Sequence, residues 1–308
     1  MKIHIKRTRP IGYLRQLLYI TLPKRLYVKI CYRWFSKGNI DLDHPKRLSE
    51  KWWWVMYYNE KHYPDLIRRI ADKYEVTEYM QEKGYGKYLK KMFGVYDYPD
   101  EIDFDSLPDK FALKLTKASG YNIICTDKSK LNVEEVRRAL REMLYILNKQ
   151  KWTAHNLAWI NEGKARIICE EFLEKKDGTQ FLELNFYCCN GVPKFTLVVN
   201  DYLDDDGKIG HDYTRNLYDA EWNPLPVEAN FQKMGYVIEK PAEYEEAYHL
   251  AQELAKDFLF LRVDLYVGDG RIILSELTPA PAGLTHFEPE AWDYKLGDML
   301  ELPNVKVF

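Results

Sequence analysis

Charged and polar side chains gather in two segments near residue 270, on either side of a tight turn. Arg262 and Asp264 precede the Gly-Asp-Gly turn at 268–270, and Glu276 and Thr278 follow it. Residues i and i+2 of a strand share a face, and Gly-Asp-Gly between two apolar runs predicts a hairpin. We therefore expect two carboxylates, a hydroxyl and a guanidinium on one surface.

These side chains fit a magnesium site next to a reacting phosphate. Two carboxylates, completed by nucleotide phosphates and waters, are a usual ligand set for Mg²⁺. The guanidinium of Arg262 can stabilise charge that develops on a transferred phosphoryl group or a tetrahedral centre. The alternative is an exposed hairpin with a Glu–Arg pair across its strands, and the hairpin alone leaves both interpretations open.

Two earlier segments fit a bound nucleotide. Lys114 lies at the end of a predicted strand and is followed by the polar loop 116–120, so its ammonium and the loop N–H groups could contact phosphates. The run 167–173 is typical of a buried strand that emerges into a polar hinge, which suits an adenine edge. A solvent-facing lysine and an ordinary strand end are the respective alternatives.

The apolar pattern predicts an α+β fold in which helices and antiparallel strands are mixed. A helix is expected from Pro64 to Lys83, and another begins at Asn132, where Glu135 completes a capping box. The stretch 95–109 is turn-rich and is expected to be a connector. The first 60 residues are expected to form short basic helices around Trp52–Trp54, as a small N-terminal unit. Further predicted elements are a helix at 244–258 and strands at 110–115, 166–172, 181–187, 193–200, 260–267 and 271–277.

Charge is distributed unevenly along the chain. Residues 1–38 contain ten basic side chains and no Asp or Glu, whereas the whole chain has a net charge of −2. This basic arm predicts an anionic partner, such as a membrane surface, a lipid-linked phosphate or an acidic glycan; a solvated basic helix is the alternative. The early apolar stretch 17–20 is too short for a signal peptide or a membrane span. The five cysteines lack metal-type spacing and fit reduced, mostly buried thiols in a cytoplasm.

Other motifs give weaker indications of function. The acidic run Asp204–Gly207 could be the metal motif of a glycosyltransferase, but an exposed acidic turn explains it more simply. The seven histidines form no HxH or HExxH pattern, although His211 and His286 fall in loops near predicted site elements. The sequence contains no Gly-rich Walker or dinucleotide fingerprint, and no nucleic-acid partner is expected.

Taken together, the segments resemble the ATP-grasp superfamily. More narrowly, the chain resembles its TupA-like branch, which is associated with teichuronopeptide and other bacterial surface-polysaccharide synthesis. The resemblance covers roughly residues 40–303. It is carried by the order of Asp72-Lys73, Lys114 with Ser119-Gly120, Glu170–Leu173, Arg262–Asp264 and Glu276–Thr278, with support from 111–114, 127–129, 216–219, 222–223 and 258–264.

The resemblance implies an ATP-grasp fold, two α+β lobes that grip ATP, preceded by a short basic helical unit. The expected regions are 1–108 for that unit and its connector, 109–195 for the lid lobe, and 196–308 for the metal-binding catalytic lobe. The residues implied to bind ATP are Lys73, Lys114, Ser119, Gly120, Glu170, Glu171, Phe172 and Leu173. Asp264, Glu276 and Thr278 are implied to bind Mg²⁺, and Arg262 is implied to be catalytic.

The sequence departs from the family pattern at two places. Thr278 stands where many ATP-grasp enzymes have Asn, and it offers a shorter neutral oxygen. Relatives of this branch usually carry Asp-Tyr-Lys where this chain has Glu183-Leu184-Asn185. The missing lysine removes one phosphate or substrate contact, for which Arg215 could compensate as a substrate-binding residue.

The resemblance implies a cytoplasmic ligase that joins a carboxylate to an amine through an acyl phosphate, with ATP and Mg²⁺ as cofactors. Its partners would be a small or glycan-linked carboxylate and an amine, and residues 1–38 would contact the inner membrane face or a lipid-linked glycan. Three alternatives remain open: a kinase that phosphorylates a sugar or another hydroxyl, a glycosyltransferase, and an ATP-binding module that has lost catalysis through Asn185 and Thr278.

Overall fold

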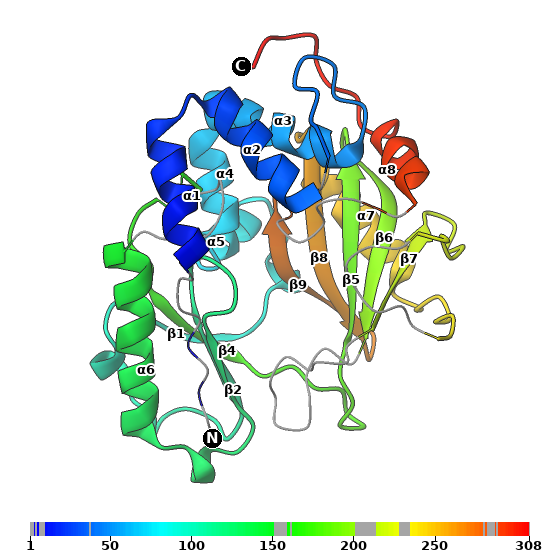
Figure 1. The fold of residues 1–308 in the computed structure, drawn as a ribbon. Helices are drawn as coiled ribbons and strands as arrows, with labels where there is room; N and C mark the ends of the chain where they lie inside the picture. The colour runs from blue at the N-terminus through cyan, green and yellow to red at the C-terminus, as the bar shows by residue number, and fades with distance from the viewer. Residues whose placement is uncertain are drawn as a thin grey trace. The chain divides into compact units, whose positions relative to one another are not determined.

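The computed structural model describes residues 3, 5, 10–36, 38–150, 159–160, 162–200, 214–227, 235–279, 281, 287 and 289–307. The chain divides into two compact units (Figure 1). The first comprises Met1–Ile20, Arg68–Glu174 and Leu203–Lys208, and the second comprises Thr21–Ile67, Lys175–Tyr202 and Ile209–Phe308. The units interleave along the sequence and do not coincide with the three consecutive regions expected, so that functional division stays a prediction.

The first unit is built on a four-stranded antiparallel sheet with the order β1–β4–β2–β3. Its strands are β1 (Met92–Tyr96), β2 (Phe111–Leu115), β3 (Asn122–Cys125) and β4 (Ile167–Glu171), and its helices are α1 (Pro10–Thr21), α5 (Glu75–Glu82) and α6 (Val133–Tyr145). The core lies between the sheet and α6, where Leu140 and Met143 pack with Leu113 and Ile167. Asn132 caps α6 as predicted, since its side chain accepts a hydrogen bond from the Glu135 N–H at 3.1 Å.

Two expectations for this unit need correction. The expected helix 64–83 is two helices, α4 (Pro64–Ala71) and α5, because Asp72 breaks the run by accepting hydrogen bonds from the Tyr74 and Glu75 N–H groups. The connector predicted at 95–109 begins with the end of strand β1. The apolar alternation of that strand is interrupted at Gly94, where its pairing with β4 is irregular. Strand β3 was also not expected from the sequence.

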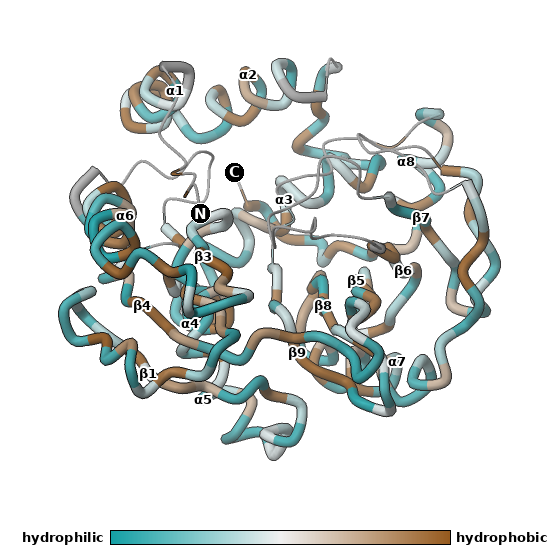
Figure 2. The backbone as a smooth tube through the Cα atoms, turned by 90° about the horizontal axis from the view of Figure 1, so that it is seen from below, coloured by the Kyte–Doolittle hydropathy of each residue, from teal (hydrophilic) through white to brown (hydrophobic). Residues whose placement is uncertain are grey.

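The second unit is built on a five-stranded antiparallel sheet with the order β7–β6–β5–β8–β9. Its strands are β5 (Leu182–Cys189), β6 (Val192–Asn200), β7 (Thr214–Asp219), β8 (Phe260–Gly268) and β9 (Arg271–Thr278), and its helices are α2 (Lys24–Ser36), α3 (Leu48–His62), α7 (Tyr244–Ala255) and α8 (Glu290–Gly297). Helix α7 contacts β5, β6 and β8, and the central strands are largely hydrophobic (Figure 2). The sequence predicted all of these strands except β7.

The tryptophan cluster belongs to this second unit. Trp52 packs with Tyr187 and Phe260 at ring-centroid distances of 6.0 and 5.5 Å, in the same core as Phe195 and Phe287. The expectation that the cluster forms the centre of a separate N-terminal unit is therefore wrong. An aromatic run inside a basic segment does not show which distant strands will cover it.

The cysteines and the membrane-spanning potential of the helices can be compared with the structure. The five cysteines are all buried, and none is part of a disulfide. Among the described residues, we find no helix whose length and apolar character would let it cross a bilayer.

Helix α8 packs against the start of α3 through a glycine. A Cβ atom on Gly297 would lie 2.1 Å from the Lys46 carbonyl oxygen and 2.9 Å from the Leu48 nitrogen. We predict that Gly297→Ala destabilises the protein by about 1–3 kcal/mol, because backbone atoms must move to admit the methyl group. Gly235→Ala is the matched control, since a Cβ there meets nothing within 4 Å. Urea unfolding of both variants measures the difference, and equal stabilities would contradict the close packing.

Candidate active site

The β8–β9 hairpin brings together the side chains that the sequence singled out. The register pairs Arg262 with Thr278 and Asp264 with Glu276. Directly paired residues point to the same face of a sheet, so all four side chains share one face, as predicted. The pairing shifts just beyond Asp264, between it and Leu265. The irregularity lies beside the paired carboxylates, and such bulges often redirect a side chain next to a functional site.

Arg262 holds Asp264 with two hydrogen bonds. Its Nε donates to Asp264 Oδ1 at 2.7 Å, and its Nη2 donates to Asp264 Oδ2 at 2.5 Å. Nη2 also donates to Thr278 Oγ1 at 3.2 Å, and the Thr278 hydroxyl donates to Glu276 Oε1 at 3.0 Å. The two carboxylates are thus connected through one guanidinium and one hydroxyl, which fixes the orientation of all four groups.

Burial makes this face electrostatically sensitive. Burial and the nearby charge of Glu276 together raise the pKa of Asp264 to about 6, although Arg262 opposes this shift. Burial alone would lower the pKa of Arg262, but Asp264 raises it well above its ordinary value. The carboxylates of Asp264 and Glu276 repel each other where water is partly excluded, and a cation between them would relieve this repulsion.

Strands β5 and β7 add polar groups to the same face. Asn185 pairs with Asp264 in the register of β5 and β8. With the amide oriented to satisfy its hydrogen bonds, its nitrogen donates to Asp264 Oδ1 at 3.0 Å and to Glu183 Oε1 at 3.2 Å. Asn185 is therefore a neutral donor next to the buried carboxylate. Arg215 pairs with Val199 on β6, and its charge lowers the pKa of Tyr187, which burial raises to about 12.

In the first unit, Lys114 and Glu170 form a buried ion pair with a second lysine. Lys114 Nζ contacts Glu170 Oε1 directly, and Lys90 Nζ donates to the same oxygen at 3.1 Å. The side chains of Lys90 and Glu170 are each 9% exposed. Burial would raise the pKa of Glu170, but the two ammonium groups lower it to about 2. Burial and the neighbouring Lys114 lower the pKa of Lys90 to about 8, although Glu170 opposes this shift.

Lys90 was missed by the sequence analysis. It lies just before β1, a strand that the sequence did not predict because Gly94 interrupts its apolar alternation. No motif marks Lys90. Glu170 is among the residues implied to bind ATP, and the structure places its carboxylate against two lysines. These contacts bring the carboxylate and two cations together at the junction of β2 and β4.

Lys73 contacts the loop that follows β2. Its ammonium donates to the Ala118 carbonyl oxygen at 2.6 Å, and its backbone N–H donates to the Thr116 carbonyl oxygen at 2.9 Å. Ala118 and Gly120 adopt positive φ values of 62° and 84°, so the loop turns sharply. The structure therefore joins Lys73 to the segment that contains Ser119 and Gly120.

Asp72 and Lys117 support this loop from the inside. Both are buried, and Lys117 Nζ lies 3.6 Å from Asp72 Oδ2. Lys117 also donates to the Glu162 carbonyl oxygen at 2.6 Å. Lys117 was not expected to matter, since a lysine in a polar loop is usually solvated. Its burial fixes the path of the loop relative to Lys73.

The hinge expected to hold adenine follows β4 directly. Glu171 exchanges two hydrogen bonds with Lys91, from the Lys91 N–H to Glu171 Oε1 and from the Glu171 N–H to the Lys91 carbonyl oxygen, both at 2.9 Å. Phe172 lies 6.0 Å from the Lys110 ammonium, and Leu173 is half-buried. The role of this segment in binding adenine stays a prediction.

Several expected features fall outside the described residues. These are the acidic run 204–207 and the loop histidines His211 and His286. In the part of the chain that is described, no three His, Cys, Asp or Glu side chains are grouped so that they could hold a metal by themselves.

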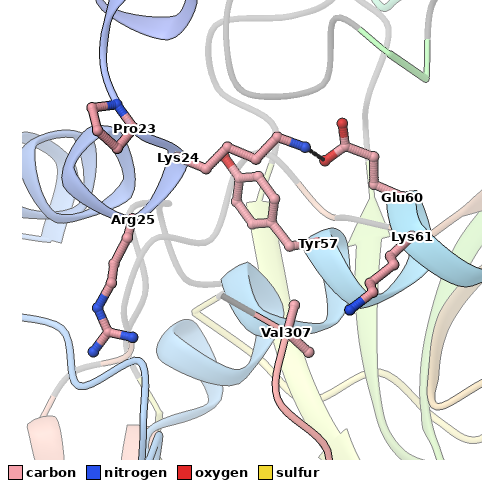
Figure 3. Close-up of a pocket in the computed structure, with 7 residues that line it drawn as sticks. All are labelled: Pro23, Lys24, Arg25, Tyr57, Glu60, Lys61 and Val307. Carbon is pink, nitrogen blue, oxygen red and sulfur yellow. Dashed lines mark hydrogen bonds and ion pairs between the residues drawn. The ribbon is translucent and has the colours of Figure 1, made fainter.

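A cavity of about 500 Å³ lies elsewhere in the second unit. It is lined by Pro23, Lys24, Arg25, Tyr57, Glu60, Lys61 and Val307 (Figure 3). Lys24 Nζ donates to Glu60 Oε2 at 2.7 Å, and Arg25 is paired with Asp43. None of the predicted site residues lines this cavity.

Residues 50–301 match the TupA-like ATP-grasp family. The match spans most of the sequence, and the chain belongs to this family. Its α+β fold, with two antiparallel sheets, is the ATP-grasp fold that the sequence predicted. A search of curated proteins returned no match.

Solved structures give only distant similarity. D-alanine–D-alanine ligase from Bacillus anthracis is 17% identical, with a TM-score of 0.41, and the match covers 75% of this chain and 65% of that one. The D-cycloserine synthetase DcsG is 17% identical, with a TM-score of 0.44 and coverage of 85% and 86%. The ATP-grasp ligase PsnB, in a complex with Mg and ADP, is 12% identical, with a TM-score of 0.40 and coverage of 93% and 69%. The chain spans slightly less than two thirds of the D-alanine–D-alanine ligase.

The buried Glu170 charge gives a testable stability effect. Glu170→Gln leaves Lys90 and Lys114 without their shared anion, so we predict a loss of about 3–5 kcal/mol at pH 7. Because the folded pKa of about 2 lies below the ordinary 4.5, this contribution is present above pH 4.5 and is lost as the pH falls toward 2. The stability difference between wild type and variant should therefore narrow in that window, as measured by chemical denaturation.

The matched control for this prediction is Glu174→Gln. Glu174 pairs with Lys110 at 2.6 Å, but both side chains are about 40% exposed, at 39% and 44%, so its loss should cost no more than about 1 kcal/mol. If both variants lose the same stability, or if the difference for Glu170→Gln stays constant down to pH 2.5, the buried pair does not have the strength inferred here.

Proposed function

We propose that the protein is an ATP-dependent carboxylate–amine ligase that forms an amide through an acyl phosphate. The observation that carries the proposal is the face of β8 and β9 on which Asp264, Glu276, Thr278 and Arg262 are connected by hydrogen bonds. Such a face can orient phosphates and stabilise the charge of a transferred group. Family membership supports ATP as the phosphate donor.

Asp264 and Glu276 fit a role as magnesium ligands. They are cross-strand partners, and Arg262 supplies one positive charge for the two carboxylates, so one negative charge remains to attract a cation. Thr278 Oγ1 is a neutral oxygen that donates to Glu276 and is linked to Asp264 through Arg262. A bound Mg²⁺ would supply Lewis-acid stabilisation of phosphate charge, with phosphate oxygens and waters completing the coordination.

Arg262 is proposed to stabilise the negative charge that develops on the acyl phosphate and the tetrahedral intermediate. Its planar guanidinium already bridges Asp264 and Thr278, and a guanidinium binds oxyanions with fixed geometry. The side chain is 19% exposed, so one edge can reach a ligand while the other keeps Asp264 oriented. This dual contact would place the acyl phosphate and the tetrahedral intermediate relative to the carboxylates.

In the first unit, we assign phosphate binding to Lys73, Lys114 and the loop with Ser119 and Gly120. Lys114 can exchange Glu170 for a phosphate, because Lys90 remains to hold the Glu170 charge. The loop offers backbone N–H groups near the Lys73 ammonium. Excluding water from the phosphates would strengthen each of these contacts. Glu171, Phe172 and Leu173 are proposed to border the adenine.

The substrate class follows from the branch of the family. We propose a uronic-acid or amino-acid carboxylate, free or on a glycan precursor, and an amine as nucleophile, with Arg215 binding the carboxylate substrate. The role would be in bacterial surface-polysaccharide synthesis, of the capsule or teichuronopeptide kind, on the cytoplasmic side. This assignment rests on the resemblance of the sequence to the TupA-like branch.

The metal-binding role of Glu276 can be tested by a conservative substitution. We predict that Glu276→Gln lowers turnover at least 100-fold, because metal-stabilised transition-state charge is commonly worth several kcal/mol. It should also reduce the rise in melting temperature that MgATP gives to wild type. Glu239→Gln, at an exposed position, should change neither. Normal magnesium-dependent turnover in Glu276→Gln would remove the main support for the site.

The reaction class can be tested by chemical trapping. With ATP, Mg²⁺ and a panel of uronic acids, we predict that hydroxylamine yields a hydroxamate together with ADP, because it intercepts an acyl phosphate. Arg262→Lys should still be stabilised by MgATP but should form less hydroxamate and amide, since lysine keeps the charge and loses the planar donor. ADP release with a stable phosphate ester would identify a kinase. Stabilisation by a UDP-sugar and not by MgATP would identify a glycosyltransferase.

A further inference from the structure

Helix α1 exposes four large apolar side chains, whereas its two long polar side chains are half-buried. Between Gly12 and Ile20 the exposed side chains are Tyr13, Leu14, Leu17 and Ile20, with exposed fractions of 42, 44, 58 and 70%. Arg15 and Gln16, the charged and amide residues of this stretch, are less exposed than these four. An ordinary surface helix shows the opposite distribution, so this face requires an explanation.

The exposed residues form one continuous stripe. Positions 13, 17 and 20 follow the spacing of a helical face, and Leu14 borders it. A helix of 12 residues is about 18 Å long. A short helix of this kind can lie in the plane of a membrane interface, with its apolar face among the acyl chains.

The next helix, α2, supplies groups that suit the headgroup region. It begins at Lys24, and only Leu22 and Pro23 separate it from the end of α1. Its exposed residues include Lys29, Arg33 and Trp34. Lysine and arginine attract anionic headgroups, and tryptophan prefers the interface between lipid and water.

All the Lys, Arg, Asp and Glu side chains in this part of the chain have the same sign of charge. Residues 1–38 carry ten Lys or Arg residues and no Asp or Glu. A purely apolar partner surface would gain nothing from these charges, whereas an anionic bilayer satisfies both the charge and the apolar stripe. We propose that α1 inserts its exposed apolar face into the interface of an anionic lipid bilayer, and that basic residues within the sequence 1–38 bind the headgroups.

This binding is independent of the proposed ligase chemistry, because none of these residues belongs to the candidate active site. It can therefore be measured without nucleotide. The protein should sediment with vesicles of phosphatidylcholine and phosphatidylglycerol at low salt, and not with phosphatidylcholine alone. Sedimentation should weaken as salt rises, since exposed charges are screened over about 10 Å at 0.1 M.

Substitutions separate the apolar and the electrostatic contributions. Ile20→Glu should lower the vesicle partition coefficient at least tenfold, whereas Val237→Glu, at a position with 61% exposure, should leave it unchanged. Lys29→Glu with Arg33→Glu should also lower it at least tenfold, because each charge near an anionic surface contributes about fivefold. Lys176→Glu, another exposed lysine, is the matched control. Circular dichroism of each variant checks that it folds.

Insertion itself can be observed with a fluorescent label. All five native cysteines are buried, so a dye that reacts with accessible thiols can be placed selectively at Leu17→Cys. The emission should shift to the blue with anionic vesicles and should be quenched by lipids with spin labels on their acyl chains. The same dye at Val237→Cys should show neither change.

Three outcomes would overturn the proposal. The first is wild-type protein that stays in the supernatant with anionic vesicles at low salt. The second is binding that is lost on charge reversal but unchanged in Ile20→Glu, because the apolar face would then not insert. The third is a dimer in sedimentation velocity that Ile20→Glu converts to a monomer, because a second copy of the chain would then cover the stripe. MgATP-induced stabilisation is measured separately, so failure of the membrane proposal is distinguishable from failure of the proposed ligase function.

Discussion

The paired hydrogen bonds between Arg262 and Asp264 set the arrangement of the second unit's polar face. Asp264 is almost fully buried and lies between a guanidinium and the amide of Asn185. A buried carboxylate without such partners would be neutralised or would destabilise the fold. Because Arg262 also reaches Thr278, the same pair fixes the group that contacts Glu276. The geometry of the candidate metal site therefore depends on one ion pair.

The first unit also contains a buried ion pair, but there the positive charges outnumber the negative one. Glu170 is the buried anion there, and Lys114 and Lys90 approach the same carboxylate oxygen. One anion shared by two cations leaves surplus positive charge, whereas the β8–β9 hairpin, with Asp264 and Glu276 beside Arg262, has surplus negative charge. A phosphate suits the first surplus and a metal ion suits the second. These charges are consistent with the roles that we propose, phosphate binding by the first unit and metal binding by the second.

The sequence was most informative where a local rule sufficed. The Gly-Asp-Gly turn and the i, i+2 spacing predicted the shared face of Arg262 and Asp264, and the capping box predicted the start of α6. It was least informative where local signals conflicted with packing. Gly94 interrupts the apolar alternation of β1, so neither this strand nor the adjacent Lys90 was predicted. The aromatic run at Trp52 gave no indication that distant strands would cover it. Asp72 ended a helix whose apolar periodicity continued beyond it.

The sequence by itself determined the family, the α+β class and the hairpin of Arg262, Asp264, Glu276 and Thr278, because these depend on residue order and on strand and turn periodicity. Only the tertiary structure decided that Lys90 shares Glu170 with Lys114, that Lys73 holds the loop at Ala118, and that α1 turns its apolar residues outward. These features depend on which residues far apart in sequence approach each other and on which side chains stay exposed. Both follow from packing of the whole chain, which no short stretch of sequence specifies.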